Sequence, residues 1–320
     1  MHFMTRIVFM GSPDFAVPTL KKLADKNATR TQPYEVVGVV TQPDRPAGRG
    51  REVKPPAVKT LALELGLDII QPEKLKIPEA MEQLHRWQPD LIVVAAFGQI
   101  LRAEVLALPV QGCINVHASL LSRWRGAAPI QAAISAGDAE TGITIMKMDK
   151  GVDTGAILSQ HAIPIEEDDT GGSLTKKLAG LGADLLNESL PGYLSGELQL
   201  QPQDESKATY APMLKKEDAR LDLTRDAVDL ARRVRALNPR PGAFIEWKAE
   251  MLKLHKAHSV KRMPQITVAG EVPTGQRLIY EGTPAISTND GLLILDEVQP
   301  AGKKPMSGKA FLAGARGWES

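Results

Sequence analysis

The chain has a single cysteine, Cys113, among its 320 residues. One thiol excludes an internal disulfide framework and a zinc cluster built from cysteines, and it is typical of a protein from a reducing, cytoplasmic compartment. The chain also has no run that approaches about 20 apolar residues, the length of a membrane span. Its first residues, MHFMTRIVFMGSPDF, contain no long apolar stretch followed by a small-residue cleavage site. We therefore expect neither a membrane anchor nor a secretory leader.

The glycine pattern G-x-G-x-x-G is missing after the first apolar run, Arg6–Met10. That pattern forms the pyrophosphate-binding turn of dinucleotide-binding folds, so an α/β fold in this chain need not bind NAD. Internal repeats and low-complexity segments are missing as well. A length of 320 residues is long for one hydrophobic core and predicts two domains.

The first part of the chain has the pattern of an α/β fold. Apolar runs alternate with helical segments up to Ala133, which predicts a Rossmann-like, mostly parallel sheet covered by helices. The run Asp90–Ala96 is almost unbroken, as expected of a central strand that is buried on both faces.

The last third of the chain changes to short β-rich runs separated by glycine, a pattern that predicts a small β-barrel. These runs are Ala243–Trp247, Met251–Lys256, Gly270–Val272, Arg277–Tyr280, Ala285–Ser287 and Leu292–Leu295. A helical segment, Thr170–Leu186, ends the first part, and a polar connection begins at Pro191. We expect a first domain over 1–195, a linker over 196–213 and a second domain over 214–320.

Charge is divided unevenly between the two parts. Residues 1–205 hold 20 Lys and Arg against 25 Asp and Glu, a net charge of −5, whereas residues 206–320 hold 19 against 13, a net charge of +6. This asymmetry indicates that the second part meets a polyanion. A surface preference without any partner is the alternative.

A second basic region is the segment Gln42–Lys59. Its four prolines and two glycines predict a loop without regular structure. A loop of this length inside a compact domain is usually functional or disordered. The basic side chains in it are Arg45, Arg49, Arg51, Lys54 and Lys59. A solvated surface loop is the alternative interpretation.

The strongest candidate for chemistry is the stretch from Cys113 to Asp153. Alternation with period two predicts a strand in which Asn115, His117 and Ser119 share one face. Residues two apart on a strand lie roughly 6.5 Å apart, so an amide and an imidazole can address one reacting atom. Asp153 lies in the turn Asp149–Gly155, between two further predicted strands, and can reach over the strand end.

An amide donor, an imidazole and a carboxylate are what acyl transfer to an amine requires. They supply a stabiliser for the developing oxyanion, a proton carrier and a group that fixes the charge of that carrier. The alternative for His117 is a core histidine whose ring is satisfied by a backbone carbonyl. Cys113 lies on the same strand face but about 13 Å from His117, beyond hydrogen-bond reach, and we expect an inert buried thiol.

These residues also carry a resemblance to a known family. The runs NVHASLLSRWRGAAPIQ (Asn115–Gln131) and GVDTG (Gly151–Gly155) resemble the folate-dependent formyltransferases, whose catalytic trio is an Asn, a His two residues later and a downstream Asp. RWRGAAPI is similar to the methionyl-tRNA formyltransferase branch in particular. So are GSPDFAVPTL (Gly11–Leu20), TQPDRPAGRG (Thr41–Gly50) and QPAGKKPMS (Gln299–Ser307). The resemblance runs from Arg6 to about Lys309.

The resemblance implies that Asn115, His117 and Asp153 are catalytic. It also implies that the small barrel of the last third is an OB-like, tRNA-binding C-terminal domain. It implies a cosubstrate, 10-formyltetrahydrofolate, whose formyl group passes to the α-amino group of methionyl-initiator tRNA. The residues implied to wrap the pterin lie in two turns: Phe97, Gly98, Gln99, Ile100, Ser119, Leu120, Leu121 and Ser122. Those implied to bind tRNA are basic: Arg45, Arg49, Arg51, Lys54, Lys303 and Lys304. No metal and no stable protein partner are implied.

Two other functions stay open on the sequence. A formyltransferase that acts on a nucleotide-linked amine or amino sugar has the same trio, and a non-catalytic RNA-binding α/β protein is an alternative of another class. The basic loop and the basic second part favour tRNA over a small amine. The intact trio Asn115, His117 and Asp153 favours an enzyme.

Overall fold

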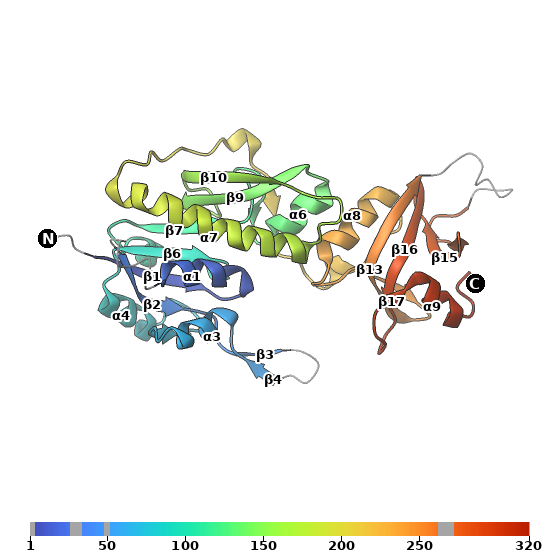
Figure 1. The fold of residues 1–320 in the computed structure, drawn as a ribbon, viewed down its shortest axis with the longest axis horizontal. Coiled ribbons are helices and arrows are strands. Elements are labelled where there is room, and N and C mark those ends of the chain that lie inside the picture. Colours follow the sequence, from blue (N-terminus) through green and yellow to red (C-terminus); the bar gives the residue numbers. More distant parts are fainter. Residues whose placement is uncertain (1–3, 26–33, 48–51, 262–271, 320) are drawn as a thin grey trace. The chain divides into compact units, whose positions relative to one another are not determined.

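The computed structural model describes residues 4–25, 34–47, 52–261 and 272–319. The chain forms two compact units, each assembled from more than one segment. The first unit comprises residues 1–127, 141–163 and 175–211, and the second comprises 128–140, 164–174 and 212–320. Figure 1 follows the elements of both units along the chain. The domain boundaries at 195 and 214 stay a prediction.

The first unit is built on a seven-stranded sheet in the order β10-β9-β7-β6-β1-β2-β5. Its strands are β1 (Thr5–Gly11), β2 (Tyr34–Val40), β5 (Ile69–Ile70), β6 (Leu91–Ala95), β7 (Cys113–His117), β9 (Glu140–Lys147) and β10 (Ile157–Pro164). The pairs from β5 through β7 are parallel, and β9 runs antiparallel to β7. The predicted Rossmann-like, mostly parallel sheet is therefore confirmed.

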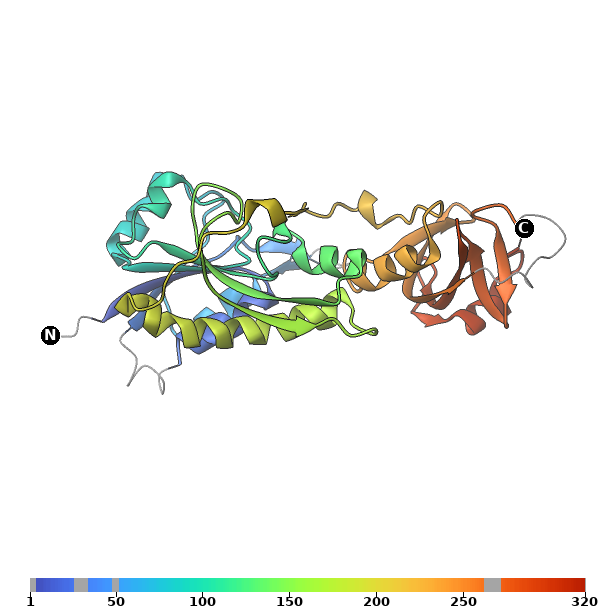
Figure 2. The same ribbon diagram turned by 90° about the horizontal axis from the view of Figure 1, so that it is seen from above.

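Helices cover both faces of this sheet, as Figure 2 shows. The first unit holds α1 (Val17–Leu23), α3 (Ala57–Glu64), α4 (Pro78–Trp87), α5 (Ala103–Leu106) and most of α7 (Gly171–Ser195). The helix α6 (Pro129–Ala136) belongs to the second unit. On one face, Trp87 of α4 and Val105 of α5 pack in a buried cluster with Met10 and Cys113. On the other face α7 comes so close that a Cβ added at Gly182 would lie 2.7 Å from Val116. Burial on both faces explains why β6 is apolar throughout.

The helix α7 is longer than the sequence predicts. It continues through Pro191 to Ser195, so the expectation of a connection starting at Pro191 was wrong. Leu190 and Tyr193 are buried, and the Tyr193 hydroxyl donates to the carbonyl of Gln111. These tertiary contacts hold the last turns of the helix in place.

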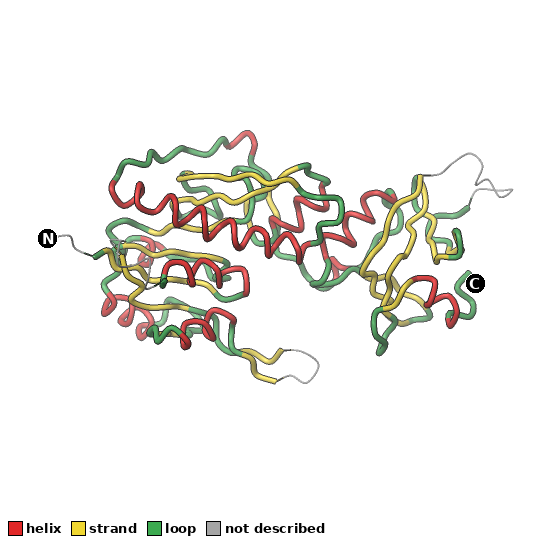
Figure 3. Tube along the Cα trace, in the orientation of Figure 1, coloured by secondary structure: helices red, strands yellow, loops and turns green. Residues whose placement is uncertain are grey.

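Regular structure also occurs in the segment Gln42–Lys59, where none was expected. Two short strands, β3 (Arg45–Ala47) and β4 (Glu52–Lys54), pair antiparallel, and Figure 3 shows them side by side. Pro46 is tolerated because a two-stranded ribbon consists of edge strands, on which a missing N–H costs little. The expectation of a loop without regular structure was therefore wrong for 45–47 and 52–54.

The second unit carries an antiparallel sheet in the order β12-β13-β16-β15-β14, with β17 paired to β16. Its elements are α8 (Ala227–Leu237), β12 (Phe244–Trp247), β13 (Glu250–Lys261), β14 (Arg277–Tyr280), β15 (Thr283–Ser287), β16 (Gly291–Gln299), β17 (Met306–Ser307) and α9 (Gly308–Gly314). Leu230 of α8 and Phe311 of α9 are buried against this sheet. The small OB-like barrel is confirmed as a half-barrel, whereas most of the predicted run Gly270–Val272 lies outside the described residues. No helix in the described ranges combines the length and the apolar character that crossing a membrane requires.

Candidate active site

Two of the predicted catalytic side chains come from the central strand β7. Ile114, Val116 and His117 are buried and Asn115 is half-buried. Asn115 and His117 share one face of the strand, as the alternation predicts, and both contact Asp153. Asp153 lies in the connection between β9 and β10 with a φ of +53°. Few residues with a side chain adopt this left-handed conformation, and aspartate does so because its short polar side chain can form local hydrogen bonds.

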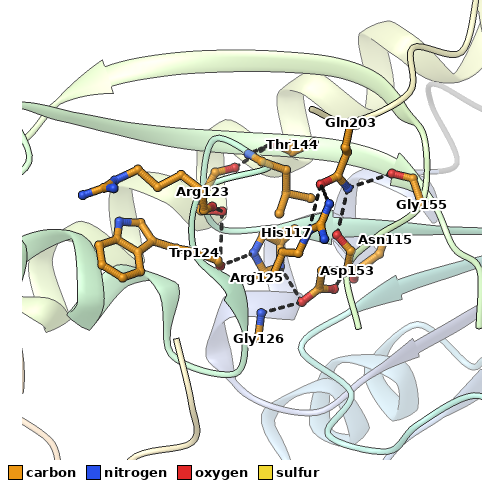
Figure 4. Close-up of polar contacts among 12 residues, drawn as sticks. Asn115, His117, Arg123, Trp124, Arg125, Gly126, Thr144, Asp153, Gly155 and Gln203 are labelled. Carbon is orange, nitrogen blue, oxygen red and sulfur yellow. Dashed lines mark hydrogen bonds and ion pairs between the residues drawn. The ribbon is translucent and has the colours of Figure 1, made fainter. Parts of the chain in front are cut away.

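The structure brings the three side chains together (Figure 4). The Nδ1 atom of His117 lies 3.5 Å from Oδ2 of Asp153, and the Asn115 Nδ2 atom donates to Oδ1 over 3.4 Å. The backbone N–H of Gly126 donates to Oδ2 over 2.8 Å. One carboxylate thus faces an imidazole, an amide and a backbone donor. The catalytic roles of these residues stay a prediction.

The other ring nitrogen of His117 also has a partner. Nε2 lies 3.0 Å from the carbonyl oxygen of Trp124, and because a carbonyl only accepts, Nε2 is the donor. The alternative interpretation of His117, a buried ring satisfied by a backbone carbonyl, is thus right for Nε2. It does not cover Nδ1, which faces the carboxylate of Asp153. Both ring nitrogens therefore face oxygen acceptors, and a ring that carries both hydrogens satisfies both of them.

The loop after β7 is fixed by a second set of polar contacts. The Ser119 hydroxyl donates to the carbonyl of Arg123 over 2.7 Å, so this side chain already has a hydrogen-bond acceptor. Thr144 Oγ1 donates to the Ser119 carbonyl over 2.7 Å and accepts from the Leu121 N–H over 3.1 Å. Gln160 adds hydrogen bonds of 2.8 Å to the Leu121 carbonyl and to Thr144. Sequence reasoning missed Thr144 and Gln160.

The two turns predicted to wrap the pterin lie at the same edge of the sheet. One follows β6 and the other follows β7, and these strands are parallel neighbours. In open parallel sheets, ligands bind outside the carboxyl ends of the strands. Phe97 is buried and Ile100 is 81% exposed. The Gln99 amide donates a hydrogen bond to the Pro72 carbonyl and accepts one from the Leu75 N–H, both in a neighbouring loop. The folate roles of both turns stay a prediction.

Four of the six residues predicted to bind tRNA lie in the part of the chain that the structure describes, two in each of two segments. Arg45 and Lys54 lie opposite each other in the β3–β4 pair, and Arg45 forms an ion pair of 3.2 Å with the exposed Glu73. Lys303 and Lys304 are exposed in the turn before β17. Arg49 and Arg51 lie outside the described residues. The tRNA role of all six stays a prediction.

Sequence reasoning also missed a buried arginine beside the site. The Arg125 side chain is fully buried, and its guanidinium donates to Glu205 over 2.9 and 2.6 Å. The Glu205 hydrogen bond raises the pKa of Arg125, and the same contact lowers the pKa of Glu205. The Arg125 guanidinium also donates to Oε1 of Gln203 over 3.1 and 2.8 Å.

The partners of this arginine come from the segment 196–213, predicted as a linker. Within it, the strand β11 (Tyr210–Ala211) pairs with β8 (Arg125–Gly126) of the loop after β7. Gly126 has a φ of +112°, and a Cβ there would lie 2.6 Å from the Ala211 carbonyl oxygen, so only glycine fits. The one local signal of this contact was an arginine directly before the small and apolar run GAAPI (Gly126–Ile130).

Other candidate groups have no place in this chemistry. Burial raises the pKa of the Cys113 thiol to about 12, so almost no thiolate forms at neutral pH. In the ranges that the structure describes, no group of three or more His, Cys, Asp and Glu side chains is arranged to hold a metal ion.

An amide, an imidazole and a carboxylate lie together at the carboxyl edge of a Rossmann-like sheet, in a chain that also carries a half-barrel unit. These are the groups that a class of acyl-transferring enzymes requires. Two family models match this chain: formyl transferase over residues 5–190, and formyl transferase, C-terminal domain, over residues 213–316. The chain therefore belongs to the formyl transferase family.

Curated relatives narrow the family further. Methionyl-tRNA formyltransferase of Bacillus pumilus is 49% identical over 98% of this chain and 95% of its own length. The protein of the same name from Methylococcus capsulatus is 47% identical, with coverage of 96% of both chains. At this identity and coverage the branch is that of the methionyl-tRNA formyltransferases, as the sequence motifs indicate.

Solved structures share the fold at lower identity. A methionyl-tRNA formyltransferase from Clostridium thermocellum has a TM-score of 0.55 at 18% identity, covering 84% of this chain and 98% of its own. An N-formyltransferase from Helicobacter canadensis, in complex with folinic acid and dTDP-3-aminofucose, has a TM-score of 0.64 at 17% identity, covering 93% of this chain and 100% of its own. HypX from Aquifex aeolicus in complex with tetrahydrofolic acid has a TM-score of 0.60 at 18% identity, covering 97% of this chain and 47% of its own.

Proposed function

We propose that this enzyme transfers the formyl group of 10-formyltetrahydrofolate to the α-amino group of methionyl-initiator tRNA, in the cytoplasm. The observation that carries the proposal is the convergence of Asn115, His117 and Asp153 on one another at the carboxyl edge of the sheet. The near full-length similarity to methionyl-tRNA formyltransferases supports the choice of substrate.

The chemistry follows from what each side chain can donate or accept. The α-amine forms a C–N bond to the formyl carbon, and the carbonyl electron pair moves to the oxygen. Asn115 and His117 donate to that oxygen as it becomes negative, which is where preorganised donors lower the barrier most. The C–N bond to the folate nitrogen then breaks, and this nitrogen takes the proton that the amine gives up. Asp153 balances the charge of His117 and helps to carry this proton.

The hydrogen bonds in the structure fit these roles. The Asn115 contact to Asp153 is long at 3.4 Å and hence weak, so the amide can turn to a substrate oxygen at little cost. The Asp153 carboxylate stays anchored by the shorter bond of 2.8 Å from Gly126. His117 must exchange one of its two acceptors to reach the substrate oxygen.

A folate donor fits the two turns at this edge. Phe97–Ile100 and Ser119–Ser122 follow neighbouring parallel strands and can enclose a flat ring between them. Fold relatives from Helicobacter canadensis and Aquifex aeolicus carry folates in their structures, which supports a folate-derived donor here. We assign the tRNA to Arg45, Arg49, Arg51, Lys54, Lys303 and Lys304, whose charges suit phosphates and exposed bases.

The test is a formylation assay with purified enzyme, charged initiator tRNA and 10-formyltetrahydrofolate. We expect formylmethionine on the tRNA only when the folate donor is present. Reactions with a sugar-nucleotide amine, with glycinamide ribonucleotide and with an uncharged tRNA serve as comparisons. Transfer to a small amine but not to methionyl-tRNA would assign the chain to the amino-sugar or nucleotide alternative. Binding of tRNA without any transfer would favour the non-catalytic alternative.

The salt dependence of tRNA binding tests the basic residues separately. If six lysines and arginines contact phosphates, the logarithm of the association constant falls linearly with the logarithm of salt, with a slope of about −0.7 per contact for single-stranded regions. We expect a steep line for the wild type and a slope shallower by about 0.7 for Arg45→Gln, which removes one contact. Fluorescence anisotropy of labelled initiator tRNA measures both. A flat response would remove these residues from the tRNA surface.

A further inference from the structure

We propose that Gln203, held by the buried Arg125, is a positioning residue that keeps Asp153 in its reactive place. The inference rests on the proposed function and adds to it two residues outside the catalytic trio. Gln203 touches no reacting atom in this assignment and acts through Asp153.

The first observation is that the Gln203 amide is fully engaged with the Asp153 turn. Its Nε2 donates to the backbone carbonyl of Asp153 over 2.8 Å and to that of Gly155 over 2.8 Å. Both hydrogens of the amide are thus spent on two carbonyls that flank Thr154. A side chain from residue 203 therefore closes the turn that carries the carboxylate.

The second observation is that Arg125 fixes the position of Gln203. Its guanidinium donates to the Gln203 Oε1 atom over 3.1 and 2.8 Å, so the amide oxygen and both amide hydrogens have set directions. Arg125 has 0% exposure, and Glu205 provides the neutralising carboxylate. A buried guanidinium with its donors satisfied has little freedom to move. Figure 4 shows Arg125 and Gln203 lying against Asp153.

The third observation is that the backbone of the same segment holds the carboxylate itself. Arg125 donates its backbone N–H to the Thr209 carbonyl over 2.8 Å, and Gly126, the next residue, donates its N–H to Asp153 Oδ2 over 2.8 Å. Asp153 is therefore held by a hydrogen bond from Gln203 to its backbone carbonyl and by one from Gly126 to its carboxylate. The pairing of β8 with β11 connects the segment that carries Gly126 to the segment that carries Gln203.

The backbone conformation of Asp153 is the reason that these hydrogen bonds matter. Its φ of +53° lies in the left-handed region, which few residues with a side chain adopt and which aspartate adopts where local hydrogen bonds hold it. Without the Gln203 hydrogen bonds, the turn relaxes and the carboxylate moves away from His117, now 3.5 Å away. Displacing a catalytic group by about 1 Å can cost a hundredfold in rate.

The variant Gln203→Glu tests the proposal with almost no change of shape. The new carboxylate still accepts from Arg125 but has no hydrogens for the carbonyls of Asp153 and Gly155. We expect kcat for formyl transfer to fall about tenfold to a hundredfold, with KM for the folate donor unchanged, because only the transition state uses Asp153. The matched control is Gln201→Glu, the same change at an exposed residue of the same segment, for which we expect wild-type kcat.

A double-mutant cycle separates positioning from general structure. If Gln203 acts through Asp153, then Gln203→Glu costs little in an Asp153→Asn background, since the group it positions is already disabled. An equal fold loss in both backgrounds overturns the proposal. Loss of kcat in the control Gln201→Glu would also overturn it.

Amide hydrogen exchange measures how firmly the Asp153 turn is held, and it does not depend on catalysis. We expect Gln203→Glu to speed amide exchange in peptides that cover 149–155 and Gly126, with exchange in β1 and β6 unchanged. Unchanged exchange in 149–155 overturns the proposal even if the enzyme formylates methionyl-tRNA. Faster exchange in residues 149–155 of Gln203→Glu, together with no formyl transfer by the wild-type enzyme, would support the positioning role of Gln203 and reject the proposed function.

Discussion

Replacing Asp153 with asparagine is expected to lower kcat for formyl transfer by about a hundredfold to ten-thousandfold, the range typical of a lost acid–base partner. The carboxylate accepts from Gly126 and Asn115 and faces Nδ1 of His117, all of which are donors or potential donors. An amide has one acceptor oxygen and two hydrogens, so it leaves at least one of these donors without a partner. It also removes the negative charge beside the imidazole.

The measurement is single-turnover formylation under saturating folate donor, with KM for the donor followed in parallel. We expect KM to stay unchanged, because the turns assigned to the pterin lie outside these contacts. A suitable control is Asp149→Asn in the same turn. There a single oxygen, Oδ1, accepts from both Gly151 and Thr154, so the amide oxygen reproduces both contacts. Nearly wild-type turnover by Asp153→Asn would remove this carboxylate from the reaction.

The sheet and two of the candidate catalytic side chains could be predicted from the sequence because the patterns that indicate them lie within single strands. The unbroken apolar run at β6 reports burial on both faces, and it is buried along its length. Alternation along β7 reports which side chains share a face, so Asn115 and His117 were placed together correctly. A strand has period two whatever its partners, and no long-range information is needed.

The contacts that surround Asp153 could not be predicted because they join distant segments. Arg125 and Gln203 are 78 residues apart, and the second lies in a polar stretch with the composition of a linker. Composition reports that such a segment has no core of its own, but not that its polar groups bind a buried guanidinium. The β3–β4 pair was missed for a similar reason, since cross-strand pairing can outweigh the proline content of Gln42–Lys59.

The second large effect on turnover is expected for Asn115→Ala, which should lower kcat about a hundredfold to a thousandfold. This corresponds to a loss of roughly 2.7–4 kcal/mol of transition-state stabilisation. The Asn115 amide can donate to an oxygen that bears full charge only after the amine has attacked. The interaction is therefore stronger in the transition state than in the bound substrate, and removing it lowers kcat while KM for the folate donor stays near its wild-type value.

The same substitution at Asn187 is the control for Asn115→Ala. That amide oxygen accepts from the Tyr34 hydroxyl over 3.2 Å in the same unit, away from the carboxylate, so the variant should keep its turnover. The isosteric change Asn115→Asp sharpens the test, because it keeps the volume but replaces the donor with a second carboxylate facing Asp153. A donor role requires this variant to lose at least as much rate as Asn115→Ala at pH values where both carboxyl groups are ionised, since an ionised carboxylate cannot donate to an oxyanion and repels it. If Asn115→Asp instead retained the turnover that alanine loses, the side chain would be serving to fill space, and oxyanion stabilisation would have to be reassigned to His117 alone.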